Sequence, residues 1–331
     1  MLSSHRDFDL FYSRLLEGQR SAIVSGLNPS GFFHFGHIGV FDTNLFFQKE
    51  YGIEVFAPIS DDESYVSDKI KSQEEGIRNA LRLAREYLAY GFDPRKTHII
   101  IDQLYTNIYN LAIKLSKSIT LSTNIAVYGY NHSDNIGLNF YPAVQSAHVL
   151  LPETLGMRNV LVPIGPDEDA HLRVARDIAE KHGYEKPAVL HSRFLPGLDG
   201  KKMSKSKGNA VYFMESEESI KKKISSAFSG GRASIEEHRK LGGIPEIDVA
   251  FIYLKYLFLE PEEAEELAKD YRSGRLLSGE LKNILYEKVA ERVERFKENY
   301  QRIGERELSL SIVKNEDVDL EGLLDKYEVL E

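Results

Sequence analysis

The sequence contains no cysteine among its 331 residues. This absence excludes disulfide bonds, thiolate metal sites and cysteine nucleophiles. Tryptophan is absent too, and no apolar run reaches the roughly 20 residues that a helix needs to cross a bilayer. The first residues, "MLSSHRDFDL", lack the pattern of a signal peptide. We therefore expect a cytoplasmic protein without a membrane partner.

The chain has fewer basic than acidic residues, with 42 Lys and Arg and 51 Asp and Glu, which gives a formal net charge of −9. Such a surface does not attract nucleic acid indiscriminately, although local basic stretches lie at 200–209 and 220–224. Hydrophobic residues make up 42% of the chain and charged residues 28%, which excludes the disordered and fibrous classes. The length allows one large domain and a smaller one.

Apolar runs alternate with helical patterns over the first two thirds of the chain. Short buried strands are predicted at 21–26, 52–60, 96–102 and 157–165. The clearest helix is predicted at 74–91, where apolar residues repeat at helical spacing up to Gly91. This alternation predicts an α/β fold with a parallel sheet covered by helices, in which ligands bind at the carboxyl ends of the strands.

From about residue 216 the patterns are helical, and the acidic tail 308–331 is expected to hold a last helix. We therefore divide the chain into an α/β domain over 1–215, with a connective helical insertion, and a helical domain over 216–331.

The segment "NPSGFFHFGH", residues 28–37, follows the first predicted strand. Pro29 places a turn there, and Gly36 lets a ligand approach the backbone closely. The following residues are helical in pattern, so backbone N–H groups and the imidazoles of His34 and His37 could donate to phosphate oxygens. The arrangement suits a triphosphate, although two histidines in a turn are more often structural.

A second segment, "DGKKMSKSKGN" at 199–209, is a cationic loop between Gly200 and Gly208. Two of its lysines could close over the β and γ phosphates and stabilise the charge that builds as pyrophosphate leaves. Its serines could donate further hydrogen bonds. The two segments together are far more specific than either alone.

"HFGH" (34–37) and "KMSKS" (202–206) resemble the two signature motifs of the class I aminoacyl-tRNA synthetases, in their usual order. Adenylyltransferases share a similar histidine turn but lack the lysine loop and a helical extension. The resemblance implies a Rossmann-like catalytic domain followed by an all-helical domain that binds the anticodon.

Nearly the whole chain is similar to the archaeal and eukaryotic tryptophanyl-tRNA synthetases. The segments that carry this likeness include "ISDDESY" (59–65), "FYPAVQSA" (140–147), "AFSGGRASIEEHRKLGG" (227–243) and "DYRSGRLLSGELK" (270–282). The resemblance implies activation of tryptophan with ATP and Mg²⁺, transfer to tRNA, and a homodimer. The N-terminal extension common in that group does not precede "SHRD", so any step that needs the extension would be affected.

The resemblance also implies roles for particular residues. In catalysis it implies His34, His37, Lys202 and Lys205. For ATP binding it implies Pro29, Gly36, Asp167, Met203, Ser204 and Ser206. For amino-acid binding it implies Val24, Pro58, Glu63, Gln145, Ile164, Glu168 and Leu172, with Glu63 and Gln145 at the amino group. For the anticodon it implies Arg232 and Lys282, and it implies no metal bound by protein side chains.

This chain departs from the group in the predicted side-chain pocket. A tyrosine and a glutamine usually fix the indole ring, and Val24 and Pro58 stand at those positions; Glu168 and Leu172 replace a glutamine and an aromatic residue. An indole N–H without a partner loses roughly 1–3 kcal/mol. Either the indole contact comes from other residues, or the chain is a paralogue for another amino acid or for a role outside translation. A third hypothesis is a tRNA-binding paralogue without catalysis. Ala233 replaces the usual aspartate beside Arg232, which leaves anticodon reading open.

Overall fold

The computed structural model describes residues 2–203 and 208–330. Ser204, Lys205 and Ser206 of the predicted lysine loop lie outside the described residues. Clustering of the Cα positions gives two compact units, which are described separately. One comprises residues 2–31, 40–193 and 299–330, and the other residues 32–39 and 194–298. These compact units do not test the predicted domain boundary between residues 215 and 216, which stays a prediction.

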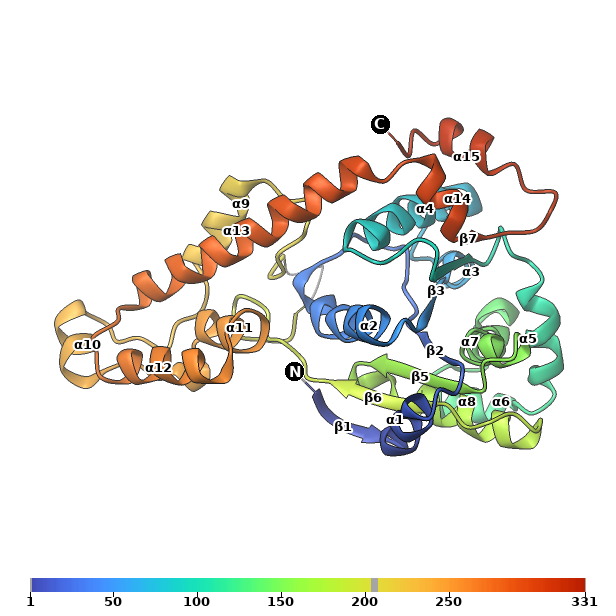
Figure 1. The fold of residues 1–331 in the computed structure, drawn as a ribbon, viewed down its shortest axis with the longest axis horizontal. Coiled ribbons are helices and arrows are strands. Elements are labelled where there is room, and N and C mark those ends of the chain that lie inside the picture. The colour runs from blue at the N-terminus through green and yellow to red at the C-terminus, as the bar shows by residue number, and fades with distance from the viewer. Residues whose placement is uncertain (1, 204–207, 331) are drawn as a thin grey trace. The chain divides into compact units, whose positions relative to one another are not determined.

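The first unit, here called the sheet unit, contains a seven-stranded sheet in the order β1-β6-β5-β2-β3-β4-β7 (Figure 1). Its strands are β1 (Leu2–Arg6), β2 (Ser21–Val24), β3 (Glu54–Ile59), β4 (Thr97–Ile101), β5 (Asn159–Ile164), β6 (Ala188–Ser192) and β7 (Ile312–Val313). All neighbouring strands pair in parallel except β1, which pairs antiparallel with β6. The predicted α/β class with a mostly parallel sheet is confirmed. The four predicted strands correspond to β2, β3, β4 and β5.

Helices of the sheet unit pack on this sheet, with α1 on β5 and β6, α7 on β5 and β2, and α4 and α14 on β4. Their bounds are α1 (Phe8–Leu16), α2 (Ile38–Tyr51, which begins in the other unit), α3 (Asp61–Val66), α4 (Gln73–Ala89), α5 (Ile108–Ser116), α6 (Leu121–Thr123), α7 (Ile136–Thr154), α8 (Asp169–Lys181), α14 (Glu305–Ser311) and α15 (Leu320–Lys326). A π-helical turn, η2, spans Asn124–Tyr128, and a 3₁₀ turn, η3, spans Pro166–Glu168.

Helix α4 shows why the sequence pattern predicted it well. The Ser72 side chain caps its first turn by accepting the Glu75 N–H at 3.1 Å. The negative charges of the acidic residues in that turn interact favourably with the positive end of the helix dipole. Gly91 follows the helix with φ 118°, a conformation that favours glycine. Start and stop signals therefore agree with the observed bounds.

The second unit, here called the helical unit, contains α9 (Glu217–Ser225), α10 (Ile235–Leu241), α11 (Val249–Leu257), α12 (Pro261–Arg272), most of α13 (Ser278–Arg302), and the 3₁₀ turns η1 (Phe35–His37) and η5 (Pro245–Ile247). Fully buried Asp248 caps α11 by accepting the N–H groups of Ala250 and Phe251. It also accepts the Gly230 N–H at 2.8 Å and the Tyr271 hydroxyl at 2.7 Å. One buried carboxylate thus ties three segments together.

One feature of the tail differs from the sequence expectation. The tail contains the predicted last helix, α15, but it also contains β7, which pairs in parallel with β4. A two-residue strand is too short to produce a recognisable alternation of polar and apolar residues in the sequence.

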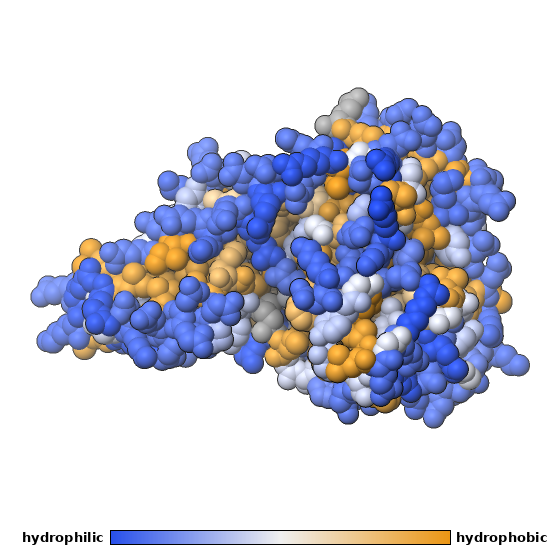
Figure 2. All heavy atoms as spheres, in the orientation of Figure 1, coloured by the Kyte–Doolittle hydropathy of each residue, from blue (hydrophilic) through white to orange (hydrophobic). Residues whose placement is uncertain are grey.

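Of the helices in the described part of the chain, none has both the length and the apolar composition to cross a membrane. Figure 2 shows mostly hydrophilic side chains on the face in view, with apolar ones between them.

Candidate functional site

The carboxyl ends of β2, β3 and β4 form one edge of the sheet, because the register pairs Val24 with Phe56 and Ile59 with Ile101. Polar residues follow each strand at this edge, namely Asn28 after β2, the "DDE" run 61–63 after β3 and Asp102 after β4. Ligands bind at this edge in open α/β sheets. Pro29 is buried in the turn after β2, where the Asn28 side chain accepts the Ser30 N–H at 3.1 Å.

Glu63 is a buried carboxylate at this edge, 9% exposed. Its Oε2 accepts from Asn28 Nδ2 at 2.5 Å, and both of its oxygens accept from Lys69 Nζ, at 2.8 and 2.9 Å. Glu63 therefore already binds an ammonium group, which is the chemistry expected of a residue that holds the amino group of an amino acid.

Gln145 on α7 lies in a short chain of polar contacts. Its Oε1 accepts the Tyr128 hydroxyl at 3.3 Å, and the Tyr128 ring stacks on His171 with centroids 4.3 Å apart. His171 Nδ1 lies 2.8 Å from Glu168 Oε2, and this hydrogen bond lowers the pKa of Glu168. The structure thus links two predicted amino-acid-binding residues, Gln145 and Glu168, through two aromatic rings. Asp167, predicted to bind ATP, is exposed on η3 beside them.

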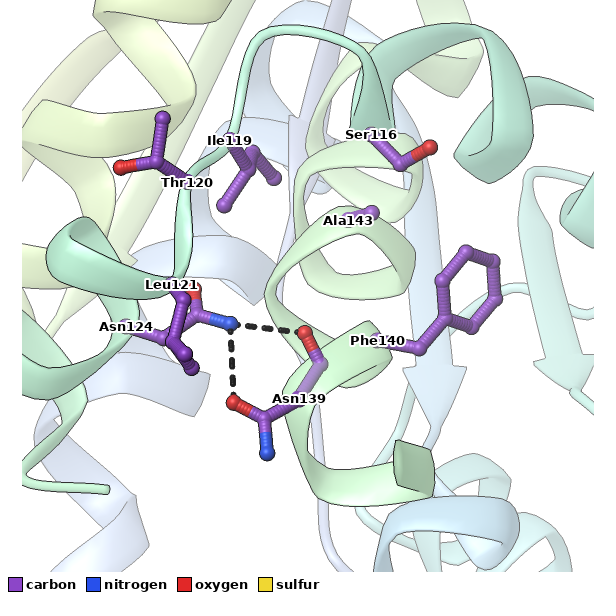
Figure 3. A pocket seen from close by; sticks show the side chains of 8 residues that line it. All are labelled: Ser116, Ile119, Thr120, Leu121, Asn124, Asn139, Phe140 and Ala143. Carbon is purple, nitrogen blue, oxygen red and sulfur yellow. Dashed lines mark hydrogen bonds between the residues drawn. The ribbon is translucent and has the colours of Figure 1, made fainter. Parts of the chain in front are cut away.

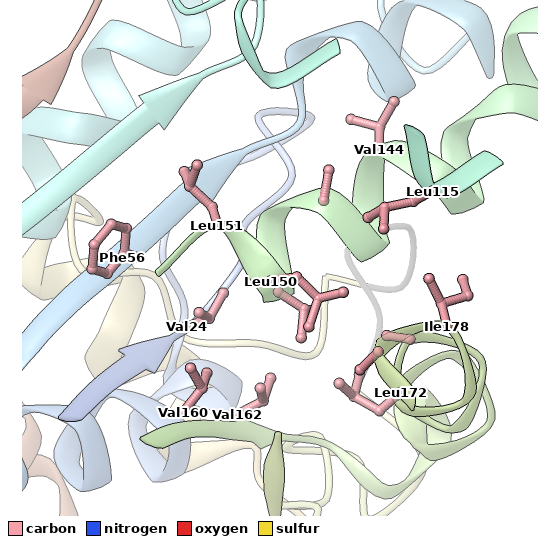
Figure 4. Close-up of a cluster of buried hydrophobic side chains, with 14 of the residues drawn as sticks. Val24, Phe56, Leu115, Val144, Leu150, Leu151, Val160, Val162, Leu172 and Ile178 are labelled. Atoms are coloured by element: carbon pink, nitrogen blue, oxygen red, sulfur yellow. The ribbon is translucent and has the colours of Figure 1, made fainter. Parts of the chain in front are cut away.

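The predicted side-chain pocket is apolar. Val24 and Leu172 are 2% and 4% exposed and pack in one buried cluster with Val160 and Val162 (Figure 4). Ile164 packs against the cluster from the end of β5, and Pro58 is buried on β3. Neither Val24 nor Pro58 carries a side-chain hydrogen-bonding group, so these two positions supply no partner for a polar ring atom.

A buried cluster of carboxylates lies at the ends of β3 and β4, where ligand oxygens of Asp61, Asp62 and Asp102 are within 4.8 Å of one another. Burial, followed by the charge of a neighbouring carboxylate, raises the pKa of Asp61 to about 6 and that of Asp62 to about 8. Burial also raises the pKa of Asp102. The cluster therefore keeps at least one proton at neutral pH.

His148 on α7 and Tyr109 on α5 complete this cluster. His148 Nε2 lies 2.6 Å from Asp102 Oδ1, and burial lowers the pKa of His148 to about 4, so the ring is neutral at pH 7. The Tyr109 hydroxyl donates to Asp62 Oδ2 at 3.1 Å. Asp102 Oδ2 is buried without a hydrogen-bond partner among the described residues.

In the helical unit, the histidine turn has a defined hydrogen-bond pattern. His34 Nδ1 accepts the Gly36 N–H at 3.1 Å, and His37 Nδ1 accepts the His34 N–H at 3.2 Å. The centroids of the two rings are 4.0 Å apart, and the ring planes are tilted by 35° to each other. Because each Nδ1 accepts, each neutral imidazole carries its proton on Nε2, the state that can donate to a phosphate oxygen.

Gly36 is exposed, and a Cβ there would lie 2.8 Å from His34 Cε1 and 2.9 Å from Met203 Sδ. The turn also pairs with the segment after the lysine loop, since the Phe35 N–H donates to the Val211 oxygen at 3.0 Å. The structure therefore brings together the histidine turn and the described start of the lysine loop.

Lys202 begins the lysine loop at the end of a short turn. Its backbone forms an antiparallel bridge with Pro196, and its carbonyl accepts from Asn209 Nδ2 at 3.2 Å. The exposed Lys202 side chain has its Nζ 5.8 Å from the centre of the Phe194 ring. Gly200 forms the turn with φ 76°. The backbone at Lys202 is thus held in place.

Arg232 and Lys282 line one pocket of about 530 Å³ in the helical unit. Arg232 Nε donates to the Gly242 oxygen and Lys282 Nζ to the Ser225 oxygen, both at 2.9 Å. Burial lowers the pKa of Lys282. The structure therefore brings the two predicted anticodon residues together, with Ala233 on the same wall.

A smaller cavity of about 210 Å³ lies between α5, α6 and α7 of the sheet unit (Figure 3). At its edge Asn124 Nδ2 donates to the Asn139 oxygen at 2.7 Å. None of the predicted site residues lines it.

Sequence reasoning missed Asp102, His148, Tyr109 and Lys69. Asp102 is the last residue of the strand predicted at 96–102, close to the edge that the "DDE" run also marks, and this position was the available signal. His148 lies three residues after Gln145 on α7, but only the structure reveals its bond to Asp102.

Comparison with known proteins places this geometry in a family. The model of the class I tRNA synthetases (W and Y) matches residues 16–294. The tryptophan–tRNA ligase of Sulfolobus acidocaldarius is 38% identical over 306 residues, which cover 90% of this chain and 79% of that protein. Tryptophan–tRNA ligase 2 of Halobacterium salinarum is 43% identical over 294 residues, 86% of this chain and 75% of that protein.

Among solved structures, the tryptophanyl-tRNA synthetase of Plasmodium falciparum matches with a TM-score of 0.86 at 33% identity, and the match covers 93% of this chain and 86% of that one. The family model, the relatives and the solved structure all indicate the same family as the histidine turn and the lysine loop. The chain belongs to the class I tRNA synthetases, in the branch that comprises the tryptophan and tyrosine enzymes.

Proposed function

We propose that this protein is a tryptophan–tRNA ligase, which activates tryptophan with ATP and transfers the tryptophanyl group to tRNA. The observation that carries the proposal is the ammonium-binding carboxylate Glu63 at the sheet edge, in a chain whose relatives are named for this activity. The buried apolar side chains of Val24 and Pro58 favour a second candidate, a paralogue that activates another amino acid or acts outside translation.

In the first step the amino-acid carboxylate attacks the α-phosphorus of ATP in line. The new carboxyl O–P bond forms as the bond between the α-phosphorus and the bridging oxygen breaks, and pyrophosphate leaves with that oxygen. No protein nucleophile is needed, so positioning is the main contribution of the protein. Glu63 and Gln145 would hold the amino group, for which Lys69 must yield its place on Glu63.

The helical unit would bind the phosphates. The Nε2–H groups of His34 and His37 would donate to phosphate oxygens, and Gly36 would allow the close approach. Lys202 would stabilise the charge on the departing pyrophosphate, together with Lys205, which lies outside the described residues. Met203, Ser204 and Ser206 are also proposed to bind ATP. In the sheet unit, Pro29 and Asp167 are proposed for the same role. Mg²⁺, when bound to the phosphates, would neutralise part of their charge.

The pocket with Arg232 and Lys282 would bind unpaired anticodon bases, because charged side chains beside a hollow suit hydrogen bonding to exposed base edges. We also propose that the protein is a homodimer and acts in the cytoplasm; light scattering on the purified chain tests the dimer.

The test is ATP–pyrophosphate exchange with each of the twenty amino acids, followed by charging of tRNA. Exchange with tryptophan alone, together with charging, supports the proposal. Exchange with another amino acid supports the paralogue. No exchange, combined with retained tRNA binding, would refute the tryptophan–tRNA ligase and support a tRNA-binding protein without catalysis.

A further inference from the structure

The turn η3 carries two residues of the proposed substrate site, Asp167 for ATP and Glu168 for the amino acid. It connects β5 to α8, and the first residue of α8 is Asp169. Among the described residues no side chain caps the start of this helix. The Asp169 carboxylate instead bonds side chains from β1 and β6. Because Asp169 directly follows Glu168, the groups that hold this carboxylate also limit where η3 can lie.

Arg6, the last residue of β1, forms a bidentate ion pair with Asp169. Its Nε donates to Oδ1 at 2.6 Å and its Nη2 to Oδ2 at 2.7 Å. The hydrogen bond from Arg6, and that from His191, lower the pKa of Asp169 to about 2, so the carboxylate is charged at neutral pH. Two parallel donors from a planar guanidinium fix the orientation of a carboxylate as well as its distance.

His191 on β6 holds the chain on both sides of η3. Its backbone pairs in parallel with Ile164, the last residue of β5 before the turn. Its buried ring has Nε2 3.0 Å from Oδ1 of Asp169, the first residue after the turn. Since the ionised Asp169 only accepts, Nε2 donates to it, and in the neutral ring Nδ1 then accepts the Ser4 hydroxyl at 2.9 Å. One residue of β6 therefore fixes both ends of the turn.

The edge strand β1 supplies the two side chains that complete this network. Ser4 and Arg6 are two residues apart on a strand that pairs antiparallel with β6 (Figure 1), so both side chains lie on the same face of the sheet. The residues of β1 are mostly exposed, so this strand buries little apolar surface. Its polar contacts, in contrast, reach the residues that hold η3.

We propose that Arg6 is a positioning residue for substrate binding, which acts through Asp169, together with Ser4 and His191, to hold η3 where Asp167 meets ATP and Glu168 meets the amino acid. This assignment rests on the proposed function and deepens it. It extends the substrate site to an edge strand that carries none of the predicted site residues.

The Arg6→Met variant tests the assignment, because methionine keeps an unbranched side chain but removes both donors to Asp169. In ATP–pyrophosphate exchange, KM for ATP and KM for the amino acid should each rise about 10-fold, the worth of one hydrogen bond to a charged group, while kcat changes less. The Kd for ATP alone, measured by isothermal titration calorimetry, should rise by a similar factor. Partial loss of the fold would instead lower kcat and leave KM unchanged.

The matched control is Arg173→Met. Arg173 Nε lies 3.5 Å from Asp169 Oδ2, so this variant removes a positive charge beside the same carboxylate. Arg173 lies one turn further along α8, however, and a contact within one helix does not anchor that helix to the sheet. Its KM values and its Kd for ATP should equal those of the wild type. In Arg6→Lys, where one ammonium replaces two parallel donors, the rise should be smaller than in Arg6→Met.

The outcomes separate two failures. Equal rises in Arg6→Met and Arg173→Met, or unchanged KM and Kd in an Arg6→Met variant that melts normally, overturn the role of Arg6. If Arg6→Met does not fold, Arg6→Lys decides, and wild-type KM and Kd values in that variant overturn the role. A wild-type protein that gives no exchange with any amino acid refutes the proposed function, whereas its Kd for ATP still tests Arg6. A wild-type protein that does not bind ATP refutes both.

Discussion

Replacing Asp62 with asparagine tests the buried carboxylate cluster directly. Burial and the neighbouring Asp102 raise the pKa of Asp62 to about 8, so the native protein carries a neutral carboxyl group at this position at pH 7. Asparagine is close to that group in size and is neutral at every pH. Its oxygen can still accept the Glu63 N–H, which lies 2.6 Å from Asp62 Oδ1. The variant should therefore fold.

The magnitude follows from proton linkage. The unfolded chain releases the Asp62 proton near its ordinary pKa of 3.8, whereas the native state keeps it up to about pH 8. Between these values the native state binds one more proton than the unfolded state, so the free energy of unfolding falls as pH rises, by about 1.4 kcal/mol per pH unit. From pH 5 to pH 7 the wild-type protein should lose about 3 kcal/mol that the Asp62→Asn variant keeps.

Urea unfolding at pH 5, 6 and 7, followed by far-ultraviolet circular dichroism, measures this difference. Circular dichroism is the suitable signal because the chain has no tryptophan. The control is Asp177→Asn, an exposed position on α8, which should follow the wild-type curve. A free-energy difference between Asp62→Asn and wild type that stays constant from pH 5 to pH 7 would refute the assignment of a buried proton to Asp62.

Three further predictions address the other parts of the site. Gly36→Ala should lower ATP–pyrophosphate exchange by roughly 10- to 100-fold at an unchanged melting temperature, because the added Cβ displaces the histidine turn; loss of the fold instead would make the glycine structural. Lys69→Met should lower KM for the amino acid by a factor of about 2 to 5, the worth of a half-exposed ion pair, because it removes an internal competitor for Glu63; a higher KM would mean that the lysine helps binding. Arg232→Ala and Lys282→Ala should each lower kcat/KM for tRNA by about 10- to 100-fold in charging assays, and an equal fall in pyrophosphate exchange would contradict a role confined to the anticodon.

The parallel sheet was predictable because its central strands are apolar runs between helical patterns. The edge strands were not. The residues of β1 are mostly exposed and polar, with the sequence "LSSHR", and β7 has only two residues. Both gain their strand conformation from pairing with β6 and β4, a tertiary effect that no local pattern records.

The site residues likewise include some that a local sequence pattern reveals and others that only the tertiary fold brings together. The histidine turn and the lysine loop are continuous in sequence, and their residue types alone indicate phosphate chemistry. The cluster of Asp62, Asp102 and His148 combines side chains from three elements that are remote in sequence. Each of these residues alone resembles an ordinary polar residue near a strand or on a helix, and its burial and pairing depend on the fold.

The helical unit is discontinuous, since it consists of residues 32–39 together with 194–298. During synthesis the histidine turn therefore leaves the ribosome well before its pairing partner at Val211 exists. The sheet likewise lacks its last strand, β7, until almost the whole chain has been made. Neither unit corresponds to a single stretch that could be expressed alone, so a fragment cut at any one position would separate paired segments. The sheet unit can complete its sheet only after β7 has been made, late in translation. A premature stop codon before β7 should therefore yield a chain that is degraded rather than a smaller working enzyme.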